Sequence, residues 1–496
     1  MKYHFHTLPF TNSFASLSED FYSRVSPTPF DTEAVLLHYN DRVADLLGLD
    51  AGVRQDPACA DICSGKTIPD EAAPLAMLYA GHQFGQYVAQ LGDGRAIMLG
   101  EIHHPDNGRF EIQLKGSGLT PYSRDGDGRA VLRSTIREYL CSEAMHGLGI
   151  PTTRALCIVG SDDEVYRERI EPGAILTRVA PSHVRFGSFE VFYYRGQPQH
   201  LRTLADYVIS HHFSGLLDAA NPYLALLETV IERTASLIAQ WQAVGFCHGV
   251  MNSDNMSILG LTLDYGPFGF MEAFNPAFVC NHSDYQGRYA YNQQPDIGLF
   301  NLSCFAQAIL PLLDNSPEQA AVIANDKLRR YVEIYNRHYR ENMRAKFGLG
   351  TEDDSDAELM KDFMYRLGKD KADFTIAFRE LSKFPSAGDV PNTMRDLFLD
   401  REAFDNWAER YQRRLQQENS IDEERHATMQ RVNPKFILRN YMAEVAIRKA
   451  EDEKNYSEID RLMTILQSPY DEHPEHEHYA GHPPDWADQL SVSCSS

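Results

Sequence analysis

The chain has 496 residues, enough to bury more than one hydrophobic core, and its 43% hydrophobic and 24% charged shares are typical of soluble globular proteins. Its net charge of −23 argues against a general nucleic-acid binder, because such proteins present a basic face to phosphates. The sequence shows no apolar run that predicts a membrane span and no signal-peptide pattern, so we expect a cytoplasmic protein without nucleic-acid or membrane partners.

Residues 1–70 contain short mixed segments with several prolines, and we predict that they form an N-terminal extension. Gly92-Asp93-Gly94 then predicts a tight turn between two strands, and an Asn-Gly pair at 107–108 predicts a hairpin between the second strand and a third. The three predicted strands cover residues 87–91, 95–102 and 110–115.

The third strand alternates, with large apolar residues on one face and Glu111, Gln113 and Lys115 on the other. A helix predicted over about 130–146 follows it and carries Glu138. A strand lysine and a helix glutamate of this kind form an ion pair in the small lobe of protein kinases.

A second amphipathic helix is predicted over Leu226–Trp241, and it leads directly into the segment that begins at His248. From about Asp296 to 468 the sequence is strongly helical, and the remainder, rich in His, Pro, Asp and Glu, predicts poor order. We therefore predict four regions: the extension (1–70), a small lobe (71–200), a large lobe (201–330) and a helical C-terminal region with a flexible tail (331–496).

The most informative motif is His248-Gly-Val-Met-Asn-Ser-Asp-Asn255, followed by Asp264-Tyr-Gly. Protein kinases have His-Arg-Asp, four residues, Asn and a later Asp-Phe-Gly in their catalytic centre. Val250 occupies the place of the kinase base and cannot accept a proton, whereas Asp254 lies close by with a carboxylate. Asn255 and Asp264 offer hard oxygen donors that suit Mg²⁺. A turn with local Asn and Asp caps is the alternative, which the joint spacing disfavours.

Gly92 and Gly94, with Arg95 beside them, are candidate phosphate contacts, because glycines let backbone N–H groups approach an anion closely. A plain hairpin turn is the alternative. An ammonium at Lys115, paired with Glu138, would position a nucleotide as a point charge. The alternative for Lys115 is a surface lysine on an edge strand.

Asp127 and Gly128 precede the first predicted helix, where the aspartate suits either a helix N-cap or an anion site, and the residues leave both open. Arg178 and Arg185 lie close to the predicted pocket in an acidic chain, which points to a phosphate role. From the residues alone, however, ordinary surface salt bridges explain these two arginines better.

The eight cysteines are scattered, without the paired Cys-x-x-Cys spacing of a zinc site, so we expect free thiols in a reducing compartment. For Cys494, near the end of the chain, an idle thiol is the simpler interpretation. The alternative is a redox latch that closes the tail onto the Cys280 segment by thiol exchange.

Five stretches of the chain together resemble the selenoprotein O family of kinase-fold pseudokinases, and the resemblance covers nearly the whole chain. The five stretches are Leu91–Ala96, Gln113–Gly118, Tyr122–Arg129, Gly249–Asn255 and Asn275–Asp284. The resemblance implies an α+β, protein-kinase-like two-lobed fold. It also implies a protein adenylyltransferase (AMPylase) that binds ATP in a flipped orientation and moves AMP to Ser, Thr or Tyr hydroxyls of protein substrates, with a link to redox stress.

The resemblance also implies roles for individual residues. It makes Asp254 the base, pairs Glu138 with Lys115, and places Mg²⁺ or Mn²⁺ on Asn255 and Asp264. The flipped ATP would give the arginines a purpose, since they would neutralise inward-pointing β- and γ-phosphates. The selenocysteine of some family members is replaced here by Cys494, so redox control remains a prediction. The nucleotide contacts implied are Gly92, Gly94, Arg95, Lys115, Asp127, Gly128, Arg178, Arg185 and Asp264.

Three alternatives stay open. The motif spacing also permits a phosphotransferase that moves the γ-phosphate to a small molecule or a protein. Base selectivity is unreadable from the residues, so UMP transfer is a second alternative. The third is a non-catalytic, nucleotide-binding pseudokinase. The sequence does not decide the oligomeric state, for which a monomer is our working expectation.

Overall fold

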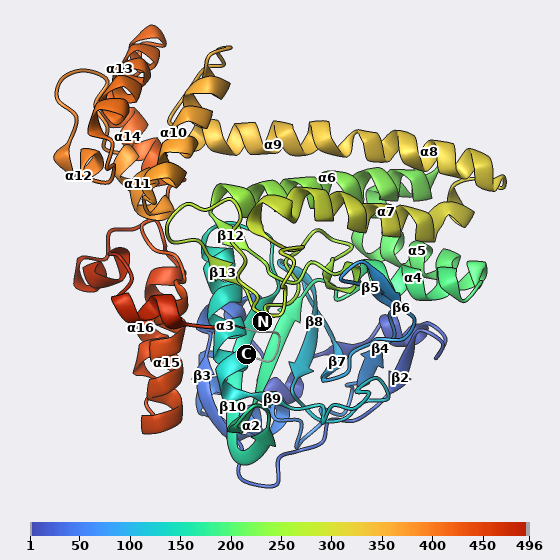
Figure 1. Ribbon diagram of the computed structural model, residues 1–496. Coiled ribbons are helices and arrows are strands. Elements are labelled where there is room, and N and C mark those ends of the chain that lie inside the picture. The colour runs from blue at the N-terminus through green and yellow to red at the C-terminus, as the bar shows by residue number, and fades with distance from the viewer. Residues whose placement is uncertain (1, 493–496) are drawn as a thin grey trace.

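Nine strands among the described residues, 2–492, form one antiparallel sheet in the computed structural model of the chain (Figure 1). The main path of the sheet has the order β2-β4-β7-β8-β11-β10-β3, with β1 beside β7 and β9 beside β11, while β5–β6 and β12–β13 pair separately. The strands are β1 (Phe10–Thr11), β2 (Tyr22–Arg24), β3 (Val35–Tyr39), β4 (Leu75–Met77), β5 (Gly81–Gln83), β6 (Gln86–Val88), β7 (Ala96–His104), β8 (Gly108–Lys115), β9 (Ala130–Val131), β10 (Arg154–Tyr166), β11 (Ile170–Ala180), β12 (Phe246–Cys247) and β13 (Gly269–Phe270).

The first seventy residues are built into this sheet. Strands β1, β2 and β3 pair with β7, β4 and β10. Helices α1 (Asp41–Leu46) and α2 (Pro57–Cys63) pack on the same core, where Val43 and Ile62 are fully buried in one cluster with Ile112 of β8. The segment predicted as an extension therefore belongs to the sheet and its core, while the predicted domain boundaries stay predictions.

Strand β8 alternates as the sequence predicts. Ile112 is fully buried in the core on one face, together with Ile175 of β11. Gln113 and Lys115 alternate with it and so lie on the opposite face. The register between β8 and β11 sets Gln113 opposite Arg178, so this second face carries the Gln113 amide beside the cationic Lys115 and Arg178.

The predicted pairing of the strand over residues 87–91 with the strand over 95–102 is wrong. Strand β6 lies there and pairs with β5, and the place beside β7 belongs to β4. Residues 91–94 instead form a loop, because the buried Asp93 carboxylate accepts hydrogen bonds from the Met77 N–H (3.1 Å) and the Gln113 side chain (3.2 Å). The predicted hairpin turn is therefore a loop anchored to the sheet.

Helix α3 (Leu132–Gly147) lies across the polar face of the sheet and brings Glu138 onto it (Figure 1). It begins later than predicted, because Ala130–Val131 pair with β11 as strand β9. Its end agrees with the prediction, since Gly149 has a φ of 76° that suits glycine and stops the helix.

Helices make up most of the chain after β11, so the mixed α+β class with a helical C-terminal half is confirmed. The predicted amphipathic helix is α6, whose first turn is capped by Asn221 and whose end is followed by Gly245 with a φ of 71°. In Figure 1, α6 to α9 lie together on one side of the sheet, α10 to α14 gather at one end, and α15 and α16 return to pack on α3. These helices are α4 (Phe186–Tyr194), α5 (Pro198–His212), α6 (Pro222–Ala243), α7 (Gln294–Leu313), α8 (Pro317–Arg329), α9 (Tyr331–Lys346), α10 (Asp356–Asp370), α11 (Phe374–Leu381), α12 (Asn392–Arg395), α13 (Arg401–Gln417), α14 (Asp422–Gln430), α15 (Asn440–Glu453) and α16 (Ser457–Leu466).

Among the residues that the structure describes, one helical stretch, Tyr291–Leu313, is long and apolar enough to cross a membrane by length and composition alone. This differs from the expectation that no run has that character. The stretch packs against α4, α6 and α8, and 61% of its most apolar window is buried inside the protein. A buried core helix has the same composition, so we assign this one to the core.

The segment after Ser468 has more structure than its composition predicts. It contains two short 3-10 helices, Pro474–Ala480 and Asp485–Gln489. Tyr479 is buried and donates a hydrogen bond to Glu458 of α16. Side-chain contacts with neighbouring helices therefore hold this segment, despite its many charged residues.

Candidate active site

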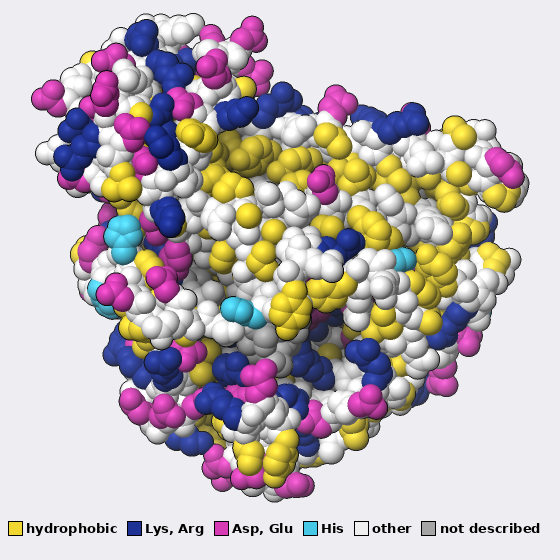
Figure 2. Space-filling view, viewed as in Figure 1, with side chains coloured by type: hydrophobic (Ala, Val, Ile, Leu, Met, Phe, Trp, Pro, Cys, Tyr) yellow, Lys and Arg dark blue, Asp and Glu magenta, His cyan; other side chains and the backbone are white. Residues whose placement is uncertain are grey.

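A cavity of about 440 Å³ lies where the polar face of the sheet meets the loop that follows α6. Figure 2 shows Lys and Arg side chains gathered around a hollow on the face of the molecule that it presents, although the chain as a whole is acidic. The predicted residues that line the cavity are Gly92, Gly94, Arg95, Lys115, Asp127, Gly128, Arg178, Arg185, Asn255 and Asp264.

Three cationic side chains converge on Asp264. Lys115 Nζ lies 3.2 Å from Asp264 Oδ1, to which Arg178 also donates, and Arg185 Nη1 lies 2.6 Å from Oδ2. Burial alone would raise the pKa of Asp264, but Arg185, Arg178 and Lys115 outweigh it and hold that pKa well below its usual value. Asp264 is therefore a fixed negative charge at the centre of a positive site.

Glu138 supplies the second carboxylate. Its Oε2 lies 2.5 Å from Lys115 Nζ, and its Oε1 lies 3.2 Å from Arg178 Nη1. Arg178 Nε also donates to Gln113 Oε1 at 3.1 Å, across the β8–β11 register. Burial lowers the pKa of Lys115, and Glu138 and Asp264 oppose that shift. The lysine and Arg178 are thus held in place from both sides.

Arg185, at the N-cap of α4, links the sheet to the loop of residues 248–255, which we call the catalytic-type loop. Its Nη1 donates to the backbone oxygen of Asp254 at 2.8 Å, and its guanidinium carbon lies 4.8 Å from the ring centre of Tyr79. Arg178 and Arg185 are both only 2% exposed, so the interpretation of these arginines as surface salt bridges is wrong. Their charges lie inside the protein beside the cavity.

The glycines of two loops allow a close approach at the cavity wall. A Cβ added to Gly92, whose φ is 130°, would lie 2.4 Å from the Tyr122 ring. A Cβ on Gly128, with a φ of 70°, would lie 2.1 Å from the Gly118 oxygen. Any side chain at these two positions would therefore push the loops apart and change the cavity.

Asp127 is not a helix N-cap. Strand β9 intervenes, and the N-cap of α3 is Val131. The Asp127 carboxylate accepts from the Arg129 N–H at 2.9 Å and forms an ion pair with Arg167 at 2.7 Å. Its hydrogen bond with Arg167 is the main reason that the pKa of Asp127 is lowered. The residue therefore orders the outer loops of the cavity.

Asp254 lies beside the cavity rather than in its lining. It is only 6% exposed in the 3-10 turn Ser253–Asn255, and its Oδ2 accepts from the Gln83 side chain at 3.3 Å. Within the described part of the chain, its Oδ1 has no hydrogen-bond partner. Burial raises the pKa of Asp254 to about 6, and Arg185 limits the increase. This carboxyl group is therefore poised to exchange a proton near neutral pH.

The oxygen donors proposed for a metal meet at the cavity. Asn255 donates from its side-chain nitrogen to the Val250 backbone oxygen at 3.0 Å, which turns its amide oxygen toward other partners. The Asp264 side chain is 20% exposed, more than the arginines around it. An amide oxygen and a carboxylate are hard donors, so the two side chains fit Mg²⁺ or Mn²⁺.

Several residues in or beside the site could not be assigned a role from the sequence. Tyr79 and Gln83 belong to the segment around β5, which gives no sign of chemistry apart from its nearby glycines. Three further arginines line the cavity: Arg124, Arg129 and Arg167. Arg124 and Arg129 lie in the stretch Tyr122–Arg129, which belongs to the family resemblance, whereas Arg167 lies outside the five stretches.

Cys280 is buried, and its thiol donates to the Pro267 backbone oxygen at 2.8 Å. Burial raises the pKa of this thiol well above its usual value, which makes it unreactive as it stands. Cys494 lies outside the described residues. The latch between the two cysteines therefore stays an alternative to the idle thiol.

Comparisons with known proteins agree on one family. Residues 4–467 match the family described as "Protein adenylyltransferase SelO". A "Protein nucleotidyltransferase YdiU" of Thiobacillus denitrificans is 54% identical over 491 residues, which is 99% of each chain. Proteins of the same name from Paraburkholderia xenovorans (53% over 499 residues; 98% of this chain and 95% of the relative) and Myxococcus xanthus (52% over 490; 99% of each) are similar.

Proposed function

The chain belongs to the protein adenylyltransferase SelO family, and we propose that it transfers AMP from ATP to hydroxyl side chains of other proteins. The observation that carries the proposal is the convergence of Lys115, Arg178 and Arg185 on Asp264 in one cavity. Three buried cations beside two carboxylates leave an excess of positive charge, which suits a polyphosphate.

The position of these cations supports a flipped nucleotide. Arg178 and Arg185 are buried at the inner side of the site, whereas Arg124 and Arg129 belong to the outer loops. Phosphates that point inward would find the two buried guanidinium groups, and the α-phosphate would then lie nearer to the Asp254 turn. In this orientation the missing base at Val250 is no obstacle, because the reacting phosphorus is a different one.

In the proposed reaction, a Ser, Thr or Tyr oxygen of the acceptor attacks the α-phosphorus of ATP. A new bond forms between that oxygen and the phosphorus, the bond to the β-phosphate oxygen breaks, and pyrophosphate leaves. Asp254 takes the hydroxyl proton, for which its raised pKa is suitable. The fixed cations stabilise the negative charge that develops on the phosphates.

Asn255 and Asp264 are the residues that would hold Mg²⁺ or Mn²⁺. A divalent ion bound there supplies charge neutralisation at the phosphate oxygens. Asp264 already has three cationic partners, which keep its carboxylate ionised and fix its position. We also propose that the sheet and the following helices form the two lobes of a protein-kinase-like fold in a cytoplasmic protein.

Separately labelled ATP tests the proposal. The protein is incubated with candidate acceptor proteins or cell extract and with ATP labelled at either the α- or the γ-phosphate. We expect label on protein from the α position only. Label that arrives only from the γ position would mean phosphate transfer and would overturn the proposal. Competition with UTP measures whether UMP is the preferred group.

A matched pair of variants separates catalysis from binding alone. Asp254→Asn keeps the shape of the buried side chain but removes the proton acceptor, and we expect a loss of about 10²–10⁴-fold in AMP transfer. Asp326→Asn, on the exposed surface of α8, is the control and keeps wild-type activity. Equal activity in both variants would identify the chain as a nucleotide-binding scaffold whose labelling comes from another enzyme.

A further inference from the structure

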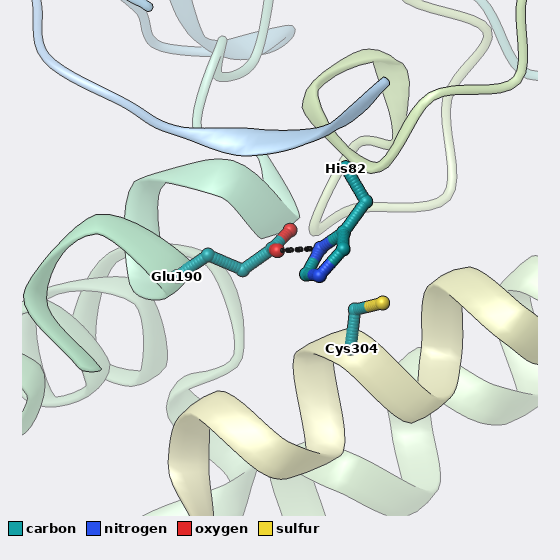
Figure 3. Close-up of side chains that lie close together, drawn as sticks. All are labelled: His82, Glu190 and Cys304. Atoms are coloured by element: carbon teal, nitrogen blue, oxygen red, sulfur yellow. Dashed lines mark hydrogen bonds and ion pairs between the residues drawn. The ribbon is translucent and has the colours of Figure 1, made fainter. Parts of the chain in front are cut away.

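Three potential metal ligands from separate elements meet close to the catalytic-type loop (Figure 3). His82 comes from β5, Glu190 from α4 and Cys304 from α7. One ligand atom from each lies within 4.8 Å of the others, and His82 Nδ1 is 2.5 Å from Glu190 Oε2. Figure 3 shows the imidazole projecting from β5 into the space between the other two side chains.

The cluster is largely buried, and the ion pair that Glu190 forms among the described residues is with His82. Glu190 is fully buried, and its Oε1 has no hydrogen-bond partner in the described part of the chain. Burial and the nearby Glu190 raise the pKa of the Cys304 thiol to about 12. A buried carboxylate with one unsatisfied oxygen is costly unless a cation or a donor completes it.

We propose that His82, Glu190 and Cys304 bind a divalent ion of the Zn²⁺ type, at a site separate from the nucleotide. Imidazole nitrogen, carboxylate oxygen and thiolate sulfur are the three donor classes that protein zinc sites use. Magnesium prefers oxygen donors alone, so the thiol distinguishes this site from the Asn255 and Asp264 pair.

The spacing of the three groups is close to what such an ion requires. Bonds of about 2.0–2.3 Å in a tetrahedral zinc site place the ligand atoms roughly 3.2–3.8 Å apart. The ion would lengthen the distance between His82 Nδ1 and Glu190 Oε2 by about an ångström. It would also bring the sulfur of Cys304 closer to both atoms. Binding releases the thiol proton to solvent, and the fourth position stays open to water. The His82 side chain is 12% exposed, which gives the ion a path inward.

A bound ion would help to hold the catalytic-type loop in position. The His82 N–H donates to Ser253 Oγ at 2.7 Å, and the next residue, Gln83, donates to Asp254 at 3.3 Å. An ion on His82 would join this strand to α4 and α7, on which Glu190 and Cys304 lie. It would thereby fix the strand whose side chain contacts the proposed base.

Cobalt(II) substitution tests the site without any nucleotide. The full-length protein is freed of metal with a chelator and titrated with Co²⁺, whose bond to a thiolate gives a near-ultraviolet charge-transfer band. We expect the band to saturate at one equivalent in the wild type and to be lost in Cys304→Ala and weakened in Glu190→Gln. Cys141→Ala, which removes a buried thiol from α3, is the matched control and keeps the band.

The same titration can overturn the proposal. A wild-type protein that gives no thiolate band has no such site, whether or not the variants fold. A band that persists in Cys304→Ala would come from another thiol and would also overturn it. Asp264→Asn is expected to keep the band, because its carboxylate belongs to the nucleotide cavity. Loss of the band in a folded Asp264→Asn protein would make the ion depend on Asp264 and would overturn the proposal of a separate site. None of these results depends on AMP transfer, so the site and the proposed function are tested separately.

Discussion

The three cavity cations and Lys346 of the C-terminal helical region are buried in opposite settings. In the cavity, three cations share two carboxylates, Asp264 and Glu138. In the C-terminal region, Lys346 at the end of α9 is 3% exposed, and its Nζ lies 4.3 Å and 5.5 Å from the ring centres of Phe378 and Phe374. No carboxylate of the described residues forms an ion pair with it, and burial lowers its pKa to about 7.

The cavity cations, paired with carboxylates, form a preorganised binding site. Lys346, buried without a carboxylate, lowers the stability of the fold. Cavity cations with partners stay charged and keep fixed positions, so they are ready for an anion when it arrives. A buried ammonium without a carboxylate partner loses its proton more readily instead. Buried charge alone is therefore a poor sign of function. A buried cluster in which opposite charges hold one another, with an excess of one sign, is a better indication of a functional site.

Among the changes that test this contrast, Asp264→Asn should give the largest effect. The change removes the carboxylate on which the three cations converge and one of the two proposed metal donors. We expect AMP transfer at saturating ATP to fall about 10²–10³-fold, because both charge balance and phosphate positioning are lost. Transfer of α-label to protein measures the rate.

The control for this change is again Asp326→Asn on the surface of α8. Thermal melting with and without ATP shows whether Asp264→Asn is folded, since breaking a buried ion pair also destabilises. A folded variant that keeps more than about a tenth of the activity would contradict the central role given to Asp264.

Lys346→Met is expected to stabilise the protein at pH 7. The pKa of Lys346 is lowered on folding, so the unfolded state binds more protons between about pH 7 and 10.5, and wild-type stability rises with pH across that window. The apolar variant lacks this slope and should gain about 2–4 kcal/mol at pH 7. Urea unfolding at several pH values measures both quantities.

The exposed Lys361→Met on α10 is the matched control and should change stability little. The opposite result for Lys346→Met, a destabilised protein at pH 7, would mean that the ammonium has a partner in solution. The contrast between the two regions would then fail.

Arg178→Lys tests geometry at constant charge. A lysine keeps the positive charge but cannot donate at once to Asp264, Glu138 and Gln113. We expect KM for ATP to rise roughly tenfold, with a smaller change in kcat. Arg233→Lys, an exposed arginine of α6 outside the cavity, is the control. An unchanged KM for ATP in Arg178→Lys would show that the positive charge alone is sufficient for ATP binding.

The sequence predicts an element or a motif correctly where a single segment contains the whole pattern. The alternation of β8, the apolar stripe of α6 and the motif from His248 to Asn255 are each local patterns. The structure brings β8 and the motif to one cavity, and α6 leads into the motif. Local periodicity decides such elements, because a single strand or helix must bury one of its faces.

Contacts between distant, short segments could not be predicted. Strand β1 has two residues and β2 has three, too few for a period to show. Gln83 meets Asp254 across 171 positions, and the three ligands of the proposed metal site lie on three elements. The N-cap interpretation of Asp127 failed because the pairing of β9 with β11 delays the helix.

Two carboxylates of the same loop region show the same contrast between paired and unpaired buried charge, because their pKa values shift in opposite directions. Cations hold the pKa of Asp264 low, whereas burial raises that of Asp254 to about 6. Only ionised Asp254 can accept the acceptor's proton, so kcat should fall about tenfold for each pH unit below about 6 and level off above about 7. Initial rates at saturating ATP between about pH 5 and 8 measure the profile, with melting at each pH to exclude acid unfolding. A profile that stays flat to about pH 5 while the protein remains folded would remove Asp254 as the base, since protonation would then cost nothing.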